Sequence, residues 1–256
     1  MAVSCSQDGY VYCWDVNSGK KVVKINSFAL DVHFSPNGTH IVTGASDNKI
    51  RLWGVNSTTE IQILGHADMI GSVQYSPNGE MLVSSSYDKT IALWDLRTHK
   101  KLKDLIGHAY SVRCASFSPD GQFVVSCSSD KTVRIWGVES GKQLKILKGH
   151  SDIVNEVRYF PYGQIIVSCS DDKTIRLWGV QAGDELQKLE GHGAPVTGID
   201  YHLFSLEIAM SLLCCFVFCK RNSLKFQTNK LKRNANKKTE SSLLKFNELG
   251  STKLNL

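Results

Sequence analysis

Serine, histidine and aspartate, the residues of a hydrolytic triad, recur together at one spacing in this 256-residue sequence. In a hydrolase the histidine takes the proton of the serine, and the aspartate orients the histidine. A catalytic site of this kind is built once in a protein, whereas the combination here occurs three times. The pattern therefore predicts a structural role for these residues and no enzymatic activity. The three sets are His66, Ser84 and Asp88; His108, Ser126 and Asp130; and His150, Ser168 and Asp172.

A tryptophan follows the aspartate of each set by six residues, and the arrangement belongs to a longer repeat. One further copy has Thr43, Asp47 and Trp53 but no histidine, and a weaker copy ends at Trp14. Successive tryptophans are 39, 41, 42 and 42 residues apart. A period this regular indicates stacked copies of one supersecondary unit, each of which buries its faces against its neighbours. The tryptophans of the three complete sets are Trp94, Trp136 and Trp178.

Each repeat contains four short segments with the character of β-strands. They are rich in valine, isoleucine and other residues that favour sheets. Turn sequences such as Ser-Pro-Asp-Gly at 118–121 separate them, because proline presets φ and glycine accepts a positive φ. Nothing in the unit is long enough for a helix. The sequence therefore predicts an all-β protein made of small antiparallel sheets, the blades of a β-propeller. In residues 107–149 the four segments are 112–117, 123–127, 132–136 and 143–147.

Over residues 1–201 the chain resembles the WD-repeat β-propeller family. The likeness lies in the Gly-His pair that opens a copy and in the Trp-Asp-like close. Aspartate follows tryptophan only at Asp15 and Asp95, and glycine takes this place in the other copies. The resemblance implies that the aspartate accepts a hydrogen bond from the histidine, which bridges to the Ser/Thr hydroxyl, and that this hydroxyl reaches the indole. The Gly-His pairs are Gly65-His66, Gly107-His108, Gly149-His150 and Gly191-His192.

The predicted propeller has four complete blades and partial first and last blades. Two architectures follow from its incomplete ends. The last strand could supply the missing inner strand of the first blade and close a five-bladed ring, which removes exposed strand edges. Alternatively the chain is a truncated isoform or fragment of a longer propeller and forms an open arc, which we favour because both ends break inside a blade. The complete blades are 27–64, 65–106, 107–148 and 149–190, the partial blade is 1–26, and the last strand is 191–201.

Residues 202–256 differ from the repeats and are expected to be a divergent basic tail, mostly disordered. Residues 203–256 hold 10 Lys/Arg and 3 Asp/Glu, whereas residues 1–202 carry a balance of −1. Broad nucleic-acid binding by the repeats is therefore not expected. The apolar run at 208–219 is shorter than the roughly 20 residues that a membrane helix needs. Tail-mediated membrane or nucleic-acid association remains an alternative function.

The eight cysteines predict neither a disulfide framework nor a metal site. Cys5, Cys127 and Cys169 fill the same small position in separate copies, which suits buried thiols. No secretory signal precedes the first strand pattern. We therefore expect an intracellular protein, cytoplasmic or nuclear, that needs no cofactor, metal or small-molecule substrate.

With no catalytic motif, the sequence predicts a scaffold for protein–protein interaction. The family resemblance implies that partners dock around the entrance of a central channel. Residues three and five past each Gly-His histidine, and the residue before each repeat aspartate, line that face. Tyr87 and Arg113 stand out because tyrosine and arginine dominate interface hot spots. The predicted face is Met69, Gly71, Tyr87, Ser111, Arg113, Ser129, Ile153, Asn155 and Asp171, with Pro195 and Thr197 beyond them.

One copy carries a second interaction motif. Its residues 94–97, Trp-Asp-Leu-Arg, are similar to the WDxR box of substrate receptors for cullin-4 ubiquitin ligases. The resemblance implies that Arg97 contacts the adaptor protein of such a ligase. A ligase substrate receptor is therefore a further alternative function, beside the reading of Arg97 as an exposed arginine at a strand end.

Overall fold

The computed structural model describes residues 1–202 and 216–217. The chain forms two units, 1–221 and 222–256, and every described residue belongs to the first. All regular structure in the described residues is β-strand, which confirms the prediction of an all-β protein built from repeated antiparallel sheets. No helix among them is long and apolar enough to span a membrane. The predicted basic tail and the apolar run at 208–219 lie outside the described residues, apart from Phe216 and Val217.

In residues 1–202 and 216–217 the strands form one three-stranded sheet, four four-stranded sheets and one two-stranded pair, and within each the strands are antiparallel. In the larger sheets each strand pairs with the next one along the chain. The first sheet contains β1 (Ala2–Cys5), β2 (Tyr10–Trp14) and β3 (Lys21–Asn26); the second contains β4 (Ala29–Phe34), β5 (His40–Ala45), β6 (Lys49–Gly54) and β7 (Glu60–Gly65); the third contains β8 (Ile70–Tyr75), β9 (Met81–Ser86), β10 (Thr90–Asp95) and β11 (Lys100–Ile106); the fourth contains β12 (Val112–Phe117), β13 (Phe123–Ser128), β14 (Thr132–Gly137) and β15 (Gln143–Lys148); the fifth contains β16 (Val154–Tyr159), β17 (Ile165–Ser170), β18 (Ile175–Gly179) and β19 (Glu185–Leu189); and β20 (Tyr201–His202) pairs with β21 (Phe216–Val217).

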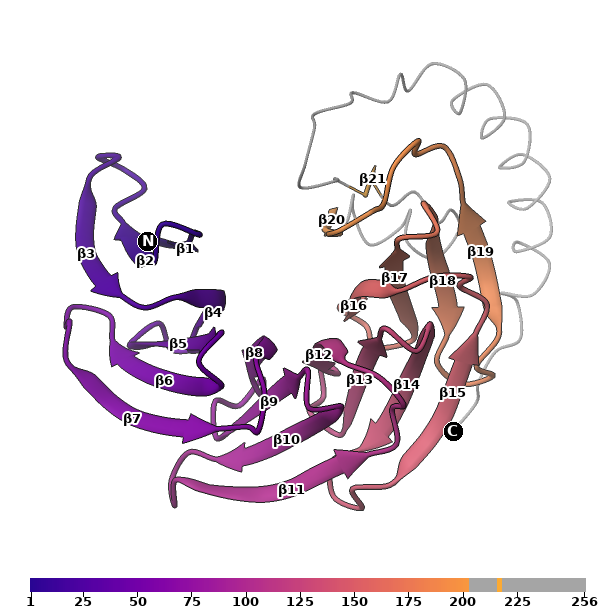
Figure 1. The fold of residues 1–256 in the computed structure, drawn as a ribbon, viewed down its shortest axis with the longest axis horizontal. Helices are drawn as coiled ribbons and strands as arrows, with labels where there is room; N and C mark the ends of the chain where they lie inside the picture. Colours follow the sequence, from indigo (N-terminus) through magenta and orange to yellow (C-terminus); the bar gives the residue numbers. More distant parts are fainter. Residues whose placement is uncertain (203–215, 218–256) are drawn as a thin grey trace, which may run out of the picture. The chain divides into compact units, whose positions relative to one another are not determined.

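The first strands of successive four-stranded sheets lie side by side, so that β4, β8, β12 and β16 form the inner edge of the array (Figure 1). The turn that leaves each of these strands has the sequence Ser-Pro-x-Gly, except after β16, where phenylalanine replaces the serine. In the fourth sheet Gly121 has φ of 71° and its N–H donates to the Ser118 carbonyl at 2.9 Å. A positive φ costs glycine little, so each turn reverses the chain tightly and starts the second strand at the same register.

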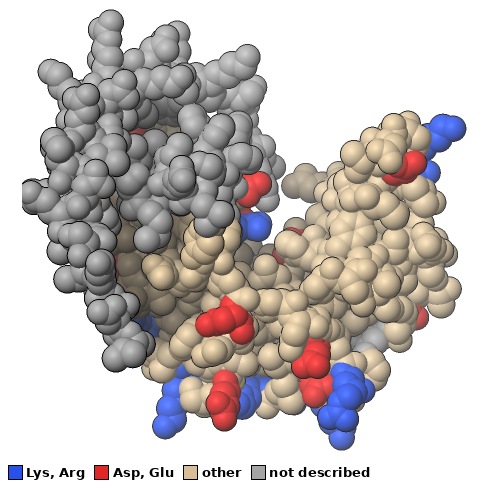
Figure 2. Space-filling model, turned by 180° about the vertical axis from the view of Figure 1, so that it is seen from behind, with Lys and Arg blue, Asp and Glu red and all other residues tan. Residues whose placement is uncertain are grey.

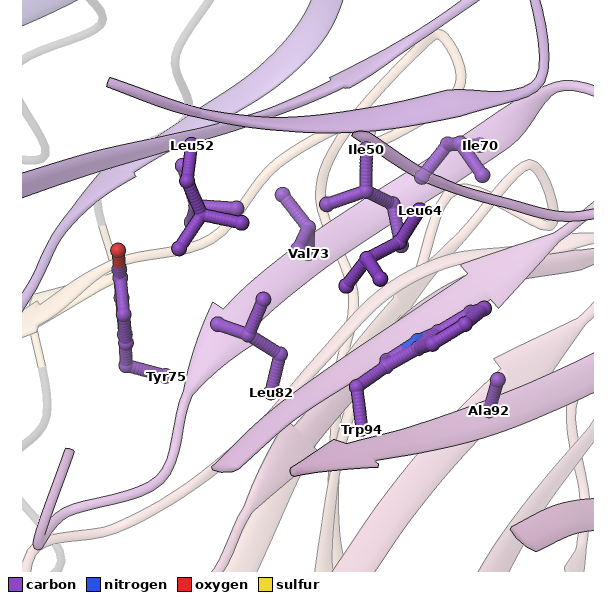
Figure 3. Close-up of a cluster of buried hydrophobic side chains, with 10 residues drawn as sticks. Ile50, Leu52, Leu64, Ile70, Val73, Tyr75, Leu82, Ala92 and Trp94 are labelled. Carbon is purple, nitrogen blue, oxygen red and sulfur yellow. The ribbon is translucent and has the colours of Figure 1, made fainter. Parts of the chain in front are cut away.

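The hydrophobic core is divided into clusters that lie between neighbouring sheets. The cluster between the second and third sheets joins Ile50, Leu52 and Leu64 to residues from β8–β10, including Trp94 (Figure 3). The same arrangement recurs between the other neighbours, and each time the repeat tryptophan of the later sheet closes the cluster. A sheet in this protein therefore buries its apolar faces against the adjacent sheets rather than in one central core.

Side chains of the inner strands also join each sheet to the next, because no backbone ladder connects them. A polar side chain at the third position of an inner strand accepts a hydrogen bond from a backbone N–H of the following sheet or segment. Such a bond satisfies a main-chain donor that would otherwise be buried without a partner. The three clearest cases are Val73 N to Asp31 Oδ2 at 3.0 Å, Ala115 N to Ser72 Oγ at 2.9 Å, and Ile199 N to Glu156 Oε2 at 2.9 Å.

The two ends of the array differ from the sheets between them. In the described residues β1 pairs only with β2, so nothing closes the first sheet against residues 191–202. Residues 196–200, expected to be a strand, are not in a strand in the described part of the chain, whereas Tyr201 and His202 pair with Val217 and Phe216. Val196 and Ile199 are nevertheless fully buried against the fifth sheet. Within the described residues, therefore, no inner strand is paired with β1.

Candidate functional site

The structure brings each predicted Ser-His-Asp-Trp set together in one hydrogen-bonded chain. In the fourth sheet, His108 Nδ1 lies 2.8 Å from Asp130 Oδ2 and His108 Nε2 lies 2.8 Å from Ser126 Oγ. The indole Nε1 of Trp136 donates to the same Ser126 Oγ at 2.8 Å. The sets at His66 and His150 repeat these contacts within 0.1 Å. Their distances are 2.9, 2.7 and 2.8 Å for His66–Asp88, His66–Ser84 and Trp94–Ser84, and 2.8 Å for each of His150–Asp172, His150–Ser168 and Trp178–Ser168.

One assignment of protons gives every polar side-chain atom of this hydrogen-bonded set a partner. Indole N–H can only donate, so Ser126 Oγ accepts from Trp136 and must donate its own proton to His108 Nε2. His108 Nδ1–H then donates to the Asp130 carboxylate. The serine is fully buried and its lone pair faces the indole, so no substrate carbonyl can reach it. This geometry positions residues for stability and not for nucleophilic attack.

The aspartate is the hub of each set, because its carboxylate joins two segments of chain. Oδ2 of Asp130 accepts from the backbone N–H of Ala109, which precedes the inner strand. Oδ1 accepts from the backbone N–H and the hydroxyl of Thr132, at 3.0 and 2.6 Å. Between them Lys131 has φ of 68°, a conformation that is uncommon for a residue with a Cβ and that these bonds hold in place. The carboxylate thus fixes the turn between β13 and β14 to the start of β12.

Sequence reasoning missed the threonine that completes the hub. The signal was present, because Asp-Lys-Thr occurs in three copies. In each, the threonine hydroxyl donates to the aspartate Oδ1 at 2.6 Å, which gives the carboxylate another partner besides the histidine. The three threonines are Thr90, Thr132 and Thr174.

Burial and hydrogen bonding set the charges of the network. Burial alone would raise the pKa of Asp130, but hydrogen bonds from His108 and Thr132 outweigh it and hold that pKa well below its usual value. The same balance lowers the pKa of Asp88 and of Asp172. Burial lowers the pKa of His108, and the neighbouring carboxylate opposes this only in part. Each set therefore contains an ionised aspartate and a neutral histidine near pH 7. The pKa values of His66 and His150 are lowered for the same reason.

The copy without a histidine keeps half of the network. Trp53 Nε1 still donates to Thr43 Oγ1, at 3.0 Å. Asp47 keeps the ion pair with the arginine four residues later, Arg51, as Asp130 does with Arg134, but 46% of its side chain is exposed, compared with 6% for Asp130. Arg51 in turn contacts Glu60 at 2.9 Å. Where the histidine is missing, the aspartate therefore lies at the surface.

The residues of the predicted partner face gather at one end of the inner strands. Three of them, Gly71, Arg113 and Asn155, are the extra residues of a β-bulge near the start of β8, β12 and β16. A bulge residue has no paired residue on the neighbouring strand. Its side chain therefore does not follow the regular alternation between the two faces of the sheet. All three, with Thr197, line a hollow of about 220 Å³ between the inner strands.

Arg113 and Tyr87 are in contact. The Arg113 guanidinium lies over the Tyr87 ring, 5.0 Å from its centroid, and donates a hydrogen bond to the phenol oxygen. Both side chains are half-buried. Nε of Arg113 is shielded from solvent and has no hydrogen-bond partner among the described residues. The tyrosine therefore holds the arginine in one orientation.

The remaining residues of the predicted face, here called the rim, lie next to the starts of the inner strands and are joined there by backbone hydrogen bonds. In the three copies with a histidine, the residue before the repeat aspartate donates its N–H to the carbonyl of the residue before the bulged strand, at 2.9 Å. Asn155 links this rim to the following segment, since its Nδ2 donates to the Asp171 carboxylate at 2.7 Å and to the Val196 carbonyl at 2.9 Å. Pro195 and Thr197 are exposed. The rim pairs are Tyr87 with Met69, Ser129 with Ser111, and Asp171 with Ile153.

Two kinds of residue at the hollow escaped the sequence reasoning. Leu30 is the bulge residue of β4 and is 49% exposed, but its copy has no Gly-His pair from which to count. Aligning the inner strands with one another would have found it. Asp31 and Glu156 also line the hollow, and their carboxylates carry the bonds between sheets described above.

Arg97, the residue of the second predicted motif, is exposed just beyond the end of β10. Its backbone N–H donates to Asp95 Oδ1 at 2.8 Å, and the N–H of Thr98 donates to the same oxygen at 2.7 Å. Asp95 thus shapes the turn from which Arg97 projects.

A comparison with protein families places these repeats. The model of the WD domain, G-beta repeat (WD40), matches four times and covers more than half of the chain, at residues 20–54, 58–95, 99–137 and 141–179. The chain belongs to the WD40-repeat family. Each WD40 repeat begins with the outer strand of one sheet and continues through three strands of the next, as β11 and β12–β14 do in the third match. A search of curated proteins finds no match.

Membership in the WD40 family bears on function in general terms. WD40 proteins are typically non-enzymatic scaffolds that mediate interactions between proteins. In this WD40 chain each Ser-His-Asp set fixes a turn of one sheet to the start of that sheet's first strand. The bulge residues at the hollow take no part in these sets. In the described residues no group of three or more His, Cys, Asp or Glu side chains is arranged to hold a metal ion.

Because Asp130 is buried and the equivalent Asp47 is exposed, we expect replacement by alanine to destabilise the protein more at Asp130. Asp130→Ala removes the acceptor of five hydrogen bonds and should lower the free energy of unfolding by about 3 kcal/mol, because it leaves buried donors unpaired. Asp47→Ala, at the exposed equivalent, should cost less than about 1 kcal/mol. Thermal and urea unfolding of both variants measures the difference. Equal losses would contradict the role of the hub, as would an esterase activity of the wild type that disappears in Asp130→Ala.

The shifted pKa values predict loss of stability in acid. The folded protein holds His66, His108 and His150 neutral, whereas the unfolded chain protonates them below about pH 6.5, so the unfolded state binds more protons. The melting temperature should therefore fall as the pH decreases from 7.5 to 5, and fall again below about pH 4 as the aspartates protonate in the unfolded chain. His108→Gln should flatten the first decrease, while His99→Gln, at an exposed residue, should not. A melting temperature constant between pH 7.5 and 5 would refute the assignment.

Proposed function

We propose that this WD40 protein is a protein–protein interaction scaffold whose partner docks on the rim and hollow at the start of the inner strands. The observation that carries the proposal is the set of bulges at Leu30, Gly71, Arg113 and Asn155, which turns one residue of each inner strand toward the same hollow. Loops and bulges that rest on a rigid framework are where binding residues concentrate.

The framework supports tight binding because little has to become ordered when a partner arrives. The aspartate hubs fix the turns that carry Tyr87, Ser129 and Asp171. Arg113 is already oriented by Tyr87. Side chains that are fixed before binding lose less conformational entropy in the complex, and this increases affinity.

The chemistry of the anchor indicates what the partner offers. Arg113 has N–H donors but no acceptor, and its Nε has no partner in the described residues. A carboxylate or main-chain carbonyl of a bound segment would accept a hydrogen bond from the guanidinium, while the Tyr87 ring would cover the apolar part of the segment. Gly71 allows β8 to lie close to β12 at this point, because a Cβ there would lie 2.6 Å from the Arg113 carbonyl oxygen.

The charge distribution supports a protein partner rather than nucleic acid. On the face shown in Figure 2, acidic and basic side chains alternate along the lower rim of the described residues, and most of the remaining surface is uncharged. Strong binding to phosphate backbones needs cations gathered on one face. The hollow itself combines Arg113 and Arg158 with Asp31 and Glu156, which leaves no excess of positive charge there.

The double variant Tyr87→Ala/Arg113→Ala tests this proposal. Proteins that co-purify with the intact chain from cells, identified by mass spectrometry, should be lost from the variant, because both anchor side chains are gone. The control Lys142→Ala/Tyr162→Ala changes an exposed cation and an exposed tyrosine in the turns at the other end of the strands, and should retain the partners. Retention by the Tyr87→Ala/Arg113→Ala variant would place the partner elsewhere.

A second candidate, a substrate receptor of a cullin-4 ligase, is favoured by the exposure of Arg97 at an ordered turn. If the WDxR-like segment serves this function, co-precipitation of the ligase adaptor should fall at least about tenfold in Arg97→Ala, the loss expected for a hot-spot arginine. Lys100→Ala, which removes an exposed cation three residues later, should leave it unchanged. Adaptor recovery that does not respond to Arg97→Ala would rule the candidate out.

A further inference from the structure

A second hollow lies at the end of the inner strands opposite to the rim, and its volume is about 340 Å³. Each of the strands β4, β8, β12 and β16 ends in an aromatic residue, and the turn that follows it contributes a proline to the lining. We call this cavity the proline hollow. Cavities of this size that combine apolar walls with a few polar groups are typical of small-molecule sites. The four prolines are Pro36, Pro77, Pro119 and Pro161.

The walls of the proline hollow are held in place by hydrogen bonds within the turns. In three of the four turns, the serine before the proline accepts a hydrogen bond from the first backbone N–H of the second strand. Proline has a fixed φ, and side chains that are ordered in advance lose little conformational freedom when a ligand binds. The cavity is therefore preformed. The three bonds are His40 N to Ser35 Oγ at 3.0 Å, Met81 N to Ser76 Oγ at 2.9 Å, and Phe123 N to Ser118 Oγ at 2.9 Å.

The charged residues of the inner strands are sorted between the two cavities. Asp31 and Glu156 line the hollow at the bulges and do not line the proline hollow. The residues two positions later on the inner strands line both cavities, so they form the boundary between them. In the described part of the chain, the proline hollow thus has cationic and neutral polar residues in its walls but no carboxylate. The boundary residues are His33, Gln74, Ser116 and Arg158.

Arg158 is a fixed cation that keeps a donor for a ligand. Its Nε donates to Glu156 Oε1 at 2.6 Å and its Nη2 lies 2.5 Å from the same oxygen, whereas its Nη1 has no hydrogen bond to a described residue. Burial alone would lower the pKa of Arg158, but the Glu156 carboxylate outweighs it and raises that pKa above its usual value. Glu156 also accepts a hydrogen bond from Ile199 N at 2.9 Å, so it shares its negative charge with a backbone donor.

Gln74 supplies a second donor at the same boundary. Its Oε1 accepts a hydrogen bond from the backbone N–H of Phe117 at 3.0 Å, which ties the side chain to β12. Because the amide oxygen is the acceptor in this bond, the two N–H groups of the side chain belong to Nε2. Nε2 has no hydrogen bond to a residue that the structure describes. The boundary therefore offers N–H donors from two different inner strands.

We infer that the proline hollow binds a small organic carboxylate. The carboxylate accepts hydrogen bonds from Arg158 Nη1 and Gln74 Nε2, and an apolar or aromatic body lies against the prolines. A hydrogen bond from a guanidinium to a carboxylate is charge-assisted, about twice as strong as a neutral one. A phosphate fits less well, because it carries nearly two negative charges and Arg158 already shares its single positive charge with Glu156.

Calorimetric titration of the full chain with cinnamate tests the inference, because cinnamate joins a carboxylate to an aromatic body. Cinnamamide has the same body without the charge, and acetate has the carboxylate without the body. Each should bind at least about tenfold more weakly than cinnamate, since each lacks one of the two interactions. Cinnamyl phosphate should also bind more weakly. Equal or tighter binding of cinnamamide or cinnamyl phosphate would overturn the inference, as would the absence of saturable cinnamate binding at millimolar concentrations.

Gln74→Glu places a negative charge at the boundary, while its carboxylate can still accept the hydrogen bond from Phe117 N. Cinnamate should bind this variant at least about tenfold more weakly than the wild type, because the two carboxylates repel each other. The matched control Gln164→Glu makes the same exchange at an exposed residue of the turn after β16, outside the proline hollow, and should bind cinnamate normally. Equal affinities of the two variants would place the probe elsewhere and refute the site.

Arg158→Gln removes the cation and should weaken the binding of cinnamate at least about tenfold while leaving that of cinnamamide unchanged. Lys142→Gln, at an exposed cation in another turn, is the control. Wild-type affinity of Arg158→Gln for cinnamate contradicts the site; if loss of the Glu156 ion pair unfolds this variant, Gln74→Glu decides the question. The partner-docking variant Tyr87→Ala/Arg113→Ala should bind cinnamate normally, and loss of binding there would contradict a site separate from the rim.

Discussion

Every sheet of this protein can bury its apolar faces only against the sheet beside it, and the rest of the structure follows from that constraint. A single four-stranded sheet has no interior, so the clusters closed by Trp53, Trp94, Trp136 and Trp178 form only when two sheets are stacked. Stability is then a sum over neighbouring pairs of sheets. The side-chain bonds from Asp31, Ser72 and Glu156 act between the same neighbours, where no backbone ladder exists.

The buried aspartates show how chemistry that looks catalytic is used for architecture. A carboxylate and an imidazole out of water are costly unless each is hydrogen-bonded, and Asp130 meets that condition with partners from two segments of chain. The serine hydroxyl of the same set is hydrogen-bonded to both His108 and Trp136, so it is not available to attack a substrate. Repetition therefore distinguishes a structural network from an active site in this chain. What remains for function is the surface that the networks hold in position.

The sequence predicted the features that depend on spacing and missed those that depend on pairing. The regular spacing of the tryptophans and Gly-His pairs was enough for the sheets, and the intervals from His108 to Ser126 and Asp130 were enough for the network. The position of Arg113 within a bulge could not be predicted, because a bulge is a shift in the pairing of two strands and has no signature in the sequence of either strand. Leu30 was missed for want of a histidine to count from. Residues 196–200 have the pattern of a strand, but a strand needs a neighbour, and sequence pattern alone does not say whether one is there.

The β-bulges separate the residues that face the hollow from the residues that hold the strands together by hydrogen bonds. Because Leu30, Gly71, Arg113 and Asn155 stand outside the ladder, their identity contributes little to the hydrogen bonding that holds the strands, and four unlike residues occupy the same place in four otherwise similar sheets. A substitution at one of these positions should therefore leave the strand pairing intact. If partners dock at the hollow as proposed, one residue per repeat would be enough to change what is recognised.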